Sequence, residues 1–131
     1  MTTIVTSADA PKAIGPYSQA TAVSTGQAGA RLIYCSGQIP LDPRTGELVK
    51  GTIEEETRRV MENVAAVLLA AGGGFQHVVK TTIFLTDLSD FAKVNEVYGG
   101  YFPADPPARS TVQVAALPRG ARVEIECIAA L

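Results

Sequence analysis

The stretch from Thr52 to Gly74 constrains the fold most, because it carries the start and stop signals of one long amphipathic helix. Thr52 is a candidate N-cap, and Glu55 follows three residues later, which is the spacing of a capping box. The glycines at 72–74 predict an end in a left-handed cap. Apolar residues recur between these ends at helical spacing, at Ile53, Val60, Val64, Val67, Leu68 and Ala71. One stripe of this helix therefore has to be buried against another layer of structure.

Segments on both sides of this helix have the composition of strands. Residues 31–36 (RLIYCS) form a β-branched and aromatic run, and the turn residues within 39–49 (IPLDPRTGELV) predict that it folds back as a hairpin. Residues 18–25 (SQATAVST) are a candidate partner strand with smaller side chains. Residues 78–87 (VVKTTIFLTD), after the helix, are again rich in β-branched residues. Together these segments can form the sheet that covers the helix.

The last third of the chain adds another helix and two more strands. A shorter helix is indicated by the apolar spacing of Phe91, Val94, Tyr98 and Phe102. Residues 110–117 (STVQVAAL) and 122–131 (RVEIECIAAL) alternate in polarity, and LPRG between them predicts a closing hairpin. This order of elements predicts an α+β fold in one domain, residues 1–131, with a mixed sheet and both helices on one of its faces.

The other face of that sheet needs a cover of its own. Thr82, Gln113 and Ala115 suggest a face that is too apolar to be left in water and too polar for an interior. Further copies of the chain would cover it, so we expect an oligomer.

Charge and composition exclude several classes of protein. The net charge is −2, from 11 basic and 13 acidic residues, and the basic residues are scattered along the chain, with only Arg58 and Arg59 adjacent, which disfavours a nucleic-acid partner. No apolar run approaches the length of a membrane span, and the first residues do not resemble a signal peptide, so we expect a cytoplasmic protein. Cys35 and Cys127 lie far apart in the sequence, and we interpret both as buried apolar residues.

No metal or cofactor site is predicted. His77 is the single histidine, and it follows the end of a helix, where a surface imidazole needs no catalytic explanation. The glycines after the first helix lack the Lys and Ser or Thr of a phosphate-binding loop, and no G-x-S-x-G motif is present.

Arg109 and Glu124 are the remaining candidates for chemistry. Arg109 stands where a proline-stiffened loop enters a strand, and Glu124 lies in the adjoining strand of the predicted hairpin, so the two could face one pocket. Equally, they could pair with each other or solvate the sheet. Alternation places Glu126 on the same face as Glu124, and spacing alone does not decide between these two carboxylates.

Several separated motifs, spread over essentially the whole chain, resemble the Rid family, the reactive intermediate deaminases, and most closely its RidA group. These motifs are IGPYSQA at 14–20, SGQIPLDP at 36–43, FLTDLSDFAKVNEVY at 84–98, PARSTV at 107–112 and EIE at 124–126. The resemblance implies a chorismate-mutase-like fold and a homotrimer whose sheets form a central barrel, with ligand sites in the clefts between subunits.

The resemblance also implies an activity, the hydrolysis of 2-iminopropanoate and 2-iminobutanoate to 2-keto acids and ammonia without a cofactor. By motif position, Arg109 would bind the substrate carboxylate and Glu124 would orient water. Tyr17 and Asn95 would line the cleft, and Gly37 would allow close approach of the backbone.

One position departs from the family pattern. Many relatives have cysteine two residues after the site arginine, whereas this chain has Thr111, which we also expect to contact substrate. This substitution argues against thiol-dependent mechanisms, but hydrolysis of an imine needs no thiol.

Two other functions remain open. A non-catalytic module could bind a 2-keto acid or another small carboxylate in the same cleft. An endoribonuclease or translation inhibitor, as some relatives have been described, has less support, because one histidine and a negative net charge suit RNA cleavage poorly.

Overall fold

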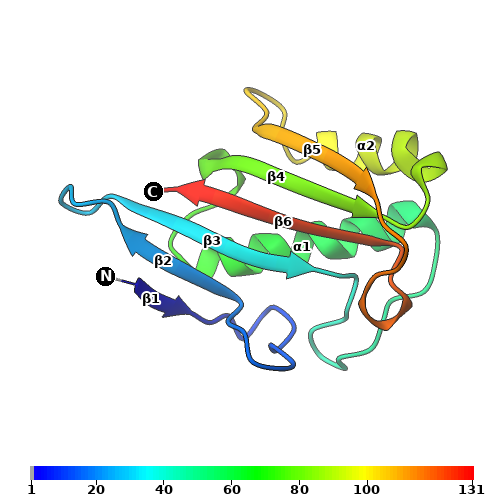
Figure 1. The fold of residues 1–131 in the computed structure, drawn as a ribbon, viewed down its shortest axis with the longest axis horizontal. Helices are drawn as coiled ribbons and strands as arrows, with labels where there is room; N and C mark the ends of the chain where they lie inside the picture. The colour runs from blue at the N-terminus through cyan, green and yellow to red at the C-terminus, as the bar shows by residue number, and fades with distance from the viewer. Residues whose placement is uncertain (1) are drawn as a thin grey trace.

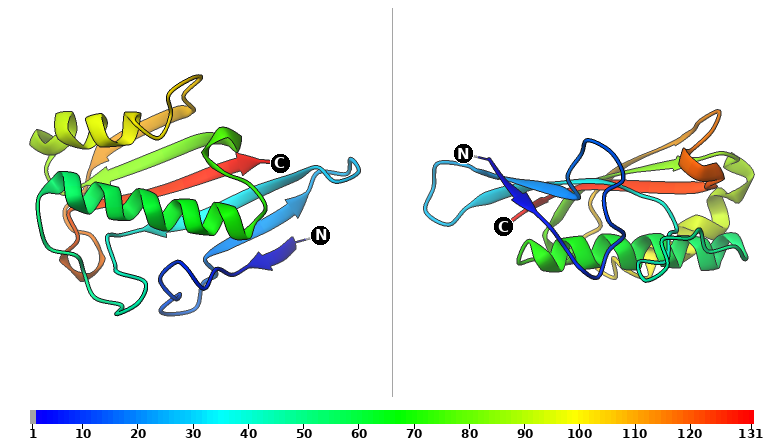
Figure 2. Two further views of the ribbon diagram at one scale, coloured as in Figure 1. Left: turned by 180° about the vertical axis from the view of Figure 1, so that it is seen from behind. Right: turned by 90° about the horizontal axis from the view of Figure 1, so that it is seen from below.

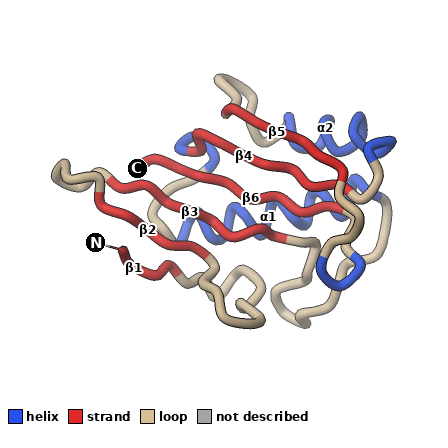
Figure 3. Tube along the Cα trace, viewed as in Figure 1, coloured by secondary structure: helices blue, strands red, loops and turns tan. Residues whose placement is uncertain are grey.

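A computed structural model, which describes residues 2–131, shows one open mixed sheet of six strands with two helices packed on one of its faces (Figures 1 and 2). The strands lie in the order β1-β2-β3-β6-β4-β5 (Figure 3). Their bounds are β1 Thr2–Val5, β2 Ala20–Ser24, β3 Arg31–Gln38, β4 Val78–Leu85, β5 Ala108–Gln113 and β6 Val123–Ala130. Neighbouring strands are antiparallel except β4 and β5, which run parallel. The predicted mixed sheet with both helices on one face is confirmed.

Helix α1 (Ile53–Ala70) begins and ends where the sequence predicts. The Thr52 hydroxyl accepts from the Glu55 backbone N–H, and the Glu55 side chain accepts from the Thr52 backbone N–H. At the other end Gly72 has φ +94°, and the Gly73 N–H donates to the Leu68 carbonyl at 2.9 Å. These bonds satisfy backbone groups that a helix end would otherwise leave without partners.

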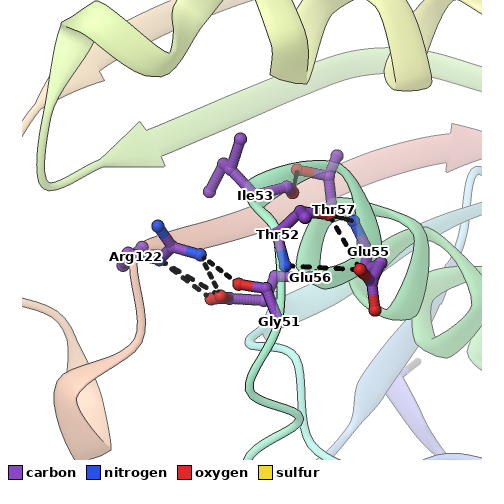
Figure 4. A network of polar contacts seen from close by, with 7 residues as sticks. All are labelled: Gly51, Thr52, Ile53, Glu55, Glu56, Thr57 and Arg122. Carbon is purple, nitrogen blue, oxygen red and sulfur yellow. Dashed lines mark hydrogen bonds and ion pairs between the residues drawn. The ribbon is translucent and has the colours of Figure 1, made fainter.

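An ion pair between the buried Glu56 and the partly exposed Arg122 joins the start of α1 to the residue before β6 (Figure 4). Glu56 is 4% exposed, and Arg122 donates to it through both Nε and Nη2. The same guanidinium donates to the Gly51 carbonyl at 2.8 Å. A buried carboxylate needs such donors because removal from water disfavours its charge. The residue just before β6 is thereby fixed against the capped end of α1.

Strand β6 occupies the middle of the sheet because alternate residues along it are apolar. Val123, Ile125, Cys127 and Ala129 are all buried under the helices. Helix α2 (Phe91–Gly99) packs beside α1 and buries Val94 and Tyr98. Cys35 and Cys127 are buried, as predicted, and they lie opposite each other across β3 and β6.

Both predicted hairpins are wrong. Residues 39–50 do not return as a strand beside β3, and they form only an isolated bridge between Leu41 and Leu48. The partners of β3 are instead β2, the weaker candidate, and β6. The last two strands do not pair either, because β4 lies between them (Figure 1). The reason is burial: β6 has enough apolar positions for the centre of a sheet, whereas β5, with none of its residues buried, forms an edge.

The helix-free face of the sheet carries a mixture of side chains. Tyr34 is 45% exposed and Val112 42% exposed. Thr82, which aligns with Glu126, lies on this face as expected. Gln113 lies on the helix-covered face instead, because it aligns with buried Leu85. Its carboxamide oxygen accepts a hydrogen bond from the Leu88 N–H, just before α2. Ala115 lies beyond the end of β5.

Neither helix is long and apolar enough to cross a membrane, within the described residues.

Candidate functional site

The Arg109 guanidinium is held in a fixed position between β5 and α2. Nη1 donates to the Asn95 carboxamide oxygen at 2.6 Å. The guanidinium carbon lies 5.0 Å from the ring centre of Tyr98 and 5.5 Å from that of Phe91, within cation–π range. Tyr98 is itself fixed, because its hydroxyl is hydrogen-bonded to the Thr81 hydroxyl at 2.7 Å. These contacts orient a planar cation toward a hollow of about 440 Å³.

Thr111 follows Arg109 on the same face of β5. Its hydroxyl is buried and finds no hydrogen-bond partner among the described residues. An unpaired buried hydroxyl costs about 1–3 kcal/mol, so this group is available to a ligand or water that reaches it.

Glu124 belongs to a different and larger cavity of about 530 Å³. Gly37 lines it, and the charged and polar side chains of the lining include Lys12, Tyr17, Arg119, Glu124 and Glu126. Loops supply much of the wall, and three of them lie side by side at this end of the sheet (Figures 1 and 2). They are residues 6–19 between β1 and β2, the segment after β3, and the loop before β6.

Gly37 lies directly against Glu124. The register between β3 and β6 shifts between Cys35 and Gln38, so the backbone bulges at this point. A Cβ atom built on Gly37 would be 2.8 Å from the Glu124 carboxyl carbon, well inside contact distance. Any larger residue at position 37 would therefore displace the carboxylate.

Burial raises the pKa of Glu124 above its ordinary value, and the like charge of Glu126 adds to this shift. Lys12 and Arg119 line the same cavity and oppose the accumulation of negative charge. A carboxylate with a raised pKa is a better proton acceptor than an exposed one, which is what a general base requires.

Arg109 and Glu124 do not share a pocket within one chain, contrary to the expectation drawn from a closing hairpin. Arg109 aligns with Thr81, which aligns with Cys127 on β6, three residues from Glu124. An odd separation places Glu124 on the opposite face, and the two Cα atoms are roughly 14 Å apart from standard strand spacings. Tyr17 and Gly37 lie with Glu124, whereas Asn95 and Thr111 lie with Arg109. The chain thus carries two candidate half-sites, one with a fixed guanidinium and one with a desolvated carboxylate.

Two residues that line the Glu124 cavity were not predicted from the sequence. Arg119 falls in the LPRG segment, which the sequence analysis interpreted only as a turn. Its φ of +60° is unusual for a residue with a side chain. Its Nη1 donates to the Gly46 carbonyl at 2.8 Å. Gln19 lies inside the IGPYSQA motif, but nothing in its spacing predicts a buried amide. His77 has a local role, because its Nδ1 accepts from the Gly74 N–H.

Comparison with known proteins identifies the family of this chain. A sequence model of the family described as Endoribonuclease L-PSP, which includes the Rid proteins, matches residues 7–131. The chain belongs to this family. The resemblance indicated by the motifs is thereby confirmed.

Individual relatives are similar over nearly their full length. Protein DfrA of Myxococcus xanthus is 62% identical over 92% of this chain and 88% of its own. A mouse protein named 2-iminobutanoate/2-iminopropanoate deaminase is 52% identical over 96% of this chain and 89% of its own. A solved Rid-family structure from Yersinia pestis superposes with a TM-score of 0.92 at 48% identity, and each chain is covered completely.

Proposed function

We propose that this protein hydrolyses 2-imino acids, such as 2-iminopropanoate and 2-iminobutanoate, to 2-keto acids and ammonia. The observation that carries the proposal is the pair of half-sites: a fixed guanidinium at Arg109 and a desolvated carboxylate at Glu124. The name and 52% identity of the mouse relative support the same substrate class.

Arg109 binds the carboxylate of the imino acid. Asn95 occupies Nη1, and the ring of Tyr98 supports one side of the guanidinium plane, so the remaining N–H groups can donate to both oxygens of a carboxylate. This grip holds the adjacent carbon of the C=N bond in a fixed place for attack. The Thr111 hydroxyl, on the same face, accepts an N–H of the protonated imine.

Glu124 moves the protons. It accepts one proton from a water molecule as the water oxygen bonds to the imine carbon, and the C=N electron pair moves to nitrogen. The same carboxyl then returns the proton to the nitrogen of the tetrahedral adduct. As the C–N bond breaks, Glu124 accepts the hydroxyl proton of the adduct, the oxygen forms the C=O bond of the 2-keto acid, and ammonia leaves and takes that proton as ammonium. Gly37 makes room for this carboxylate, and Tyr17 forms part of the cavity rim.

A complete site requires two copies of the chain. The two half-sites of one chain face opposite sides of the sheet, so the Arg109 half-site of one copy has to meet the Glu124 cavity of another. A homotrimer with sites between subunits meets this requirement and covers the helix-free face of each sheet. A chorismate-mutase-like barrel formed from these faces is part of the same proposal.

The test is the rate of 2-keto acid release from imines generated in situ by a threonine dehydratase. The protein should raise this rate above the spontaneous one, and Arg109→Ala should abolish the increase. Arg58→Ala, which removes an exposed arginine on α1, is the matched control and should retain full activity. A wild-type protein that binds 2-ketobutyrate in calorimetry but leaves the spontaneous rate unchanged would show a binding module instead.

The description of the family as an endoribonuclease favours RNA cleavage as a second candidate. The net charge of −2 and the engagement of His77 Nδ1 by the Gly74 N–H both count against it. RNA cleavage that co-purifies with the protein and is lost in Arg109→Ala would support this candidate.

A further inference from the structure

The loop between β1 and β2, residues 6–19, forms one wall of the Glu124 cavity although it contains no helix or strand. Pro11, Lys12, Ile14 and Tyr17 all line the cavity from this loop. A wall of this kind keeps its shape only if its backbone is tied to the rest of the molecule.

The side chain of Gln19 provides that tie. It is 5% exposed, and its carboxamide oxygen accepts from the Ser7 N–H at 2.6 Å. Its amide nitrogen donates to the Ser7 carbonyl at 3.1 Å and to the Pro11 carbonyl at 2.8 Å. One side chain thus bonds to both ends of the segment 7–11.

The backbone of Gln19 is fixed to the sheet on the other side. Its carbonyl accepts from the Ser36 N–H at 2.9 Å, and the Ser36 hydroxyl donates to the neighbouring Ser18 carbonyl at 2.6 Å. Ser36 precedes Gly37, the residue that lies against Glu124. Gln19 therefore connects the loop wall to the part of β3 that borders the carboxylate.

A buried carboxamide is a costly way to fill space. Removing an amide from water costs about 1–3 kcal/mol unless its hydrogen bonds are replaced, and an apolar side chain of similar length fills the same volume without that cost. The replaced bonds select one conformation of the loop.

We infer that Gln19 is a positioning residue, which holds residues 7–17 as a water-excluding wall of the Glu124 cavity. The inference rests on the proposed function for its kinetic consequence, but its structural part stands on the hydrogen bonds alone. A loosened wall admits water to Glu124 and weakens the desolvation that makes this carboxylate a good base.

The consequence can be followed through protonation. Desolvation is the main cause of the raised pKa of Glu124, so access of water lowers that pKa. The charged and titratable groups that face Glu124 across the cavity are Lys12 and Tyr17 from the loop, Arg119 before β6, and Glu126 on β6.

The deciding experiment compares Gln19→Met with Thr57→Val. Methionine keeps the length of the side chain and removes every hydrogen bond. Thr57 is fully buried and donates to the Ile53 carbonyl at 2.7 Å, so its valine variant also loses a buried hydrogen bond, but away from the cavity. Both variants should unfold at a lower temperature than the wild type.

Only Gln19→Met should affect Glu124. NMR titration of the carboxyl carbon should give a lower pKa, and the acidic limb of the rate profile should move to lower pH. The value of kcat should fall about tenfold, as misplaced groups remote from the chemistry often cause. An unchanged Glu124 pKa and an unchanged acidic limb in a folded Gln19→Met protein would overturn the inference.

Hydrogen exchange keeps the inference falsifiable without a variant. The Ser7 amide proton of the wild type should exchange as slowly as those of the sheet, and fast exchange would overturn the inference even if Gln19→Met does not fold. If the wild type does not hydrolyse imines but Glu124 still titrates lower in Gln19→Met, the proposed function fails and the role of Gln19 stands.

Discussion

The two half-sites of this chain are built from different kinds of structure. Arg109 extends from a strand and is held by a helix, through a hydrogen bond to Asn95 and the ring of Tyr98. Glu124 also extends from a strand, but loops form much of its surroundings. The Arg109 guanidinium is therefore preorganised by regular elements, whereas the surroundings of the Glu124 carboxylate depend on loops tied down by single side chains. Changes near Arg109 should act on binding, and changes near Glu124 on protonation.

The largest effect on kcat is expected from a substitution of Glu124 itself, and it separates proton transfer from substrate binding. Glu124→Gln should lower kcat by about a thousandfold, the range in which loss of a general base falls, with little change in KM. Steady-state kinetics on in situ imines measures both constants. An equal loss in KM would assign Glu124 to substrate binding instead.

The same variant should be slightly more stable than the wild type. The pKa of Glu124 is raised in the folded chain, so the unfolded chain loses this proton at lower pH, and stability decreases as pH rises through the folded-state pKa. Glutamine removes this penalty. Thermal unfolding at neutral pH should show a higher Tm for Glu124→Gln, and the difference should vanish in acid.

Arg122→Met tests how much the anchor between α1 and β6 contributes to the stability of the strand that carries Glu124. Removing the guanidinium leaves the 4% exposed Glu56 carboxylate without its partner. Because the Arg122 side chain is itself 42% exposed, we expect a cost of about 2 kcal/mol, between the costs for surface and for fully buried pairs. Denaturant unfolding should show a decrease of that size. Arg44→Met is the control, because Arg44 pairs with Asp42 on the exposed surface and should change stability little.

Gly37→Ala should act on the base without removing it. The added Cβ would meet the Glu124 carboxyl, and the displaced carboxylate should cost about tenfold to a hundredfold in kcat. Gly100→Ala, at the end of α2, meets only the Val97 carbonyl at 3.4 Å and serves as the comparison. Similar kinetics in both alanine variants would contradict the proposed contact.

The smallest effects should come from Tyr98. Tyr98→Phe keeps the ring beside Arg109 and removes only the hydrogen bond to Thr81, so KM should rise less than threefold. Tyr98→Leu removes the cation–π contact and should raise KM by about tenfold, with kcat nearly unchanged. If Tyr98→Leu instead changes the acidic limb of the rate profile, the two half-sites are not separable in this way.

Local signals in the sequence predicted local structure well. Thr52, Glu55 and the glycines after Ala71 place both ends of α1, because caps are made by neighbours in the chain. Strand pairing was harder to predict. The motifs at 110–117 and 122–131 look like a hairpin. Strand β6 lies between β3 and β4 instead, because its alternate residues are apolar and have to be buried.

The candidate site shows the same limit. Residue types and motifs pointed to Arg109 and Glu124, but no spacing rule reports that they face opposite sides of the sheet. Gln19 was missed because its hydrogen bonds reach a loop 8–12 residues away with no periodic pattern. Side chains that act by holding a loop leave little trace in sequence periodicity.

We propose that Arg109 of one copy and Glu124 of another act on the same substrate molecule. Mixing Arg109→Ala and Glu124→Gln proteins, unfolded and refolded together at equal amounts, tests it directly. If each site combines two chains of a closed oligomer at random, about one quarter of the sites regain both groups, and about one quarter of wild-type activity should return. A mixture no more active than its separately refolded components would contradict the claim.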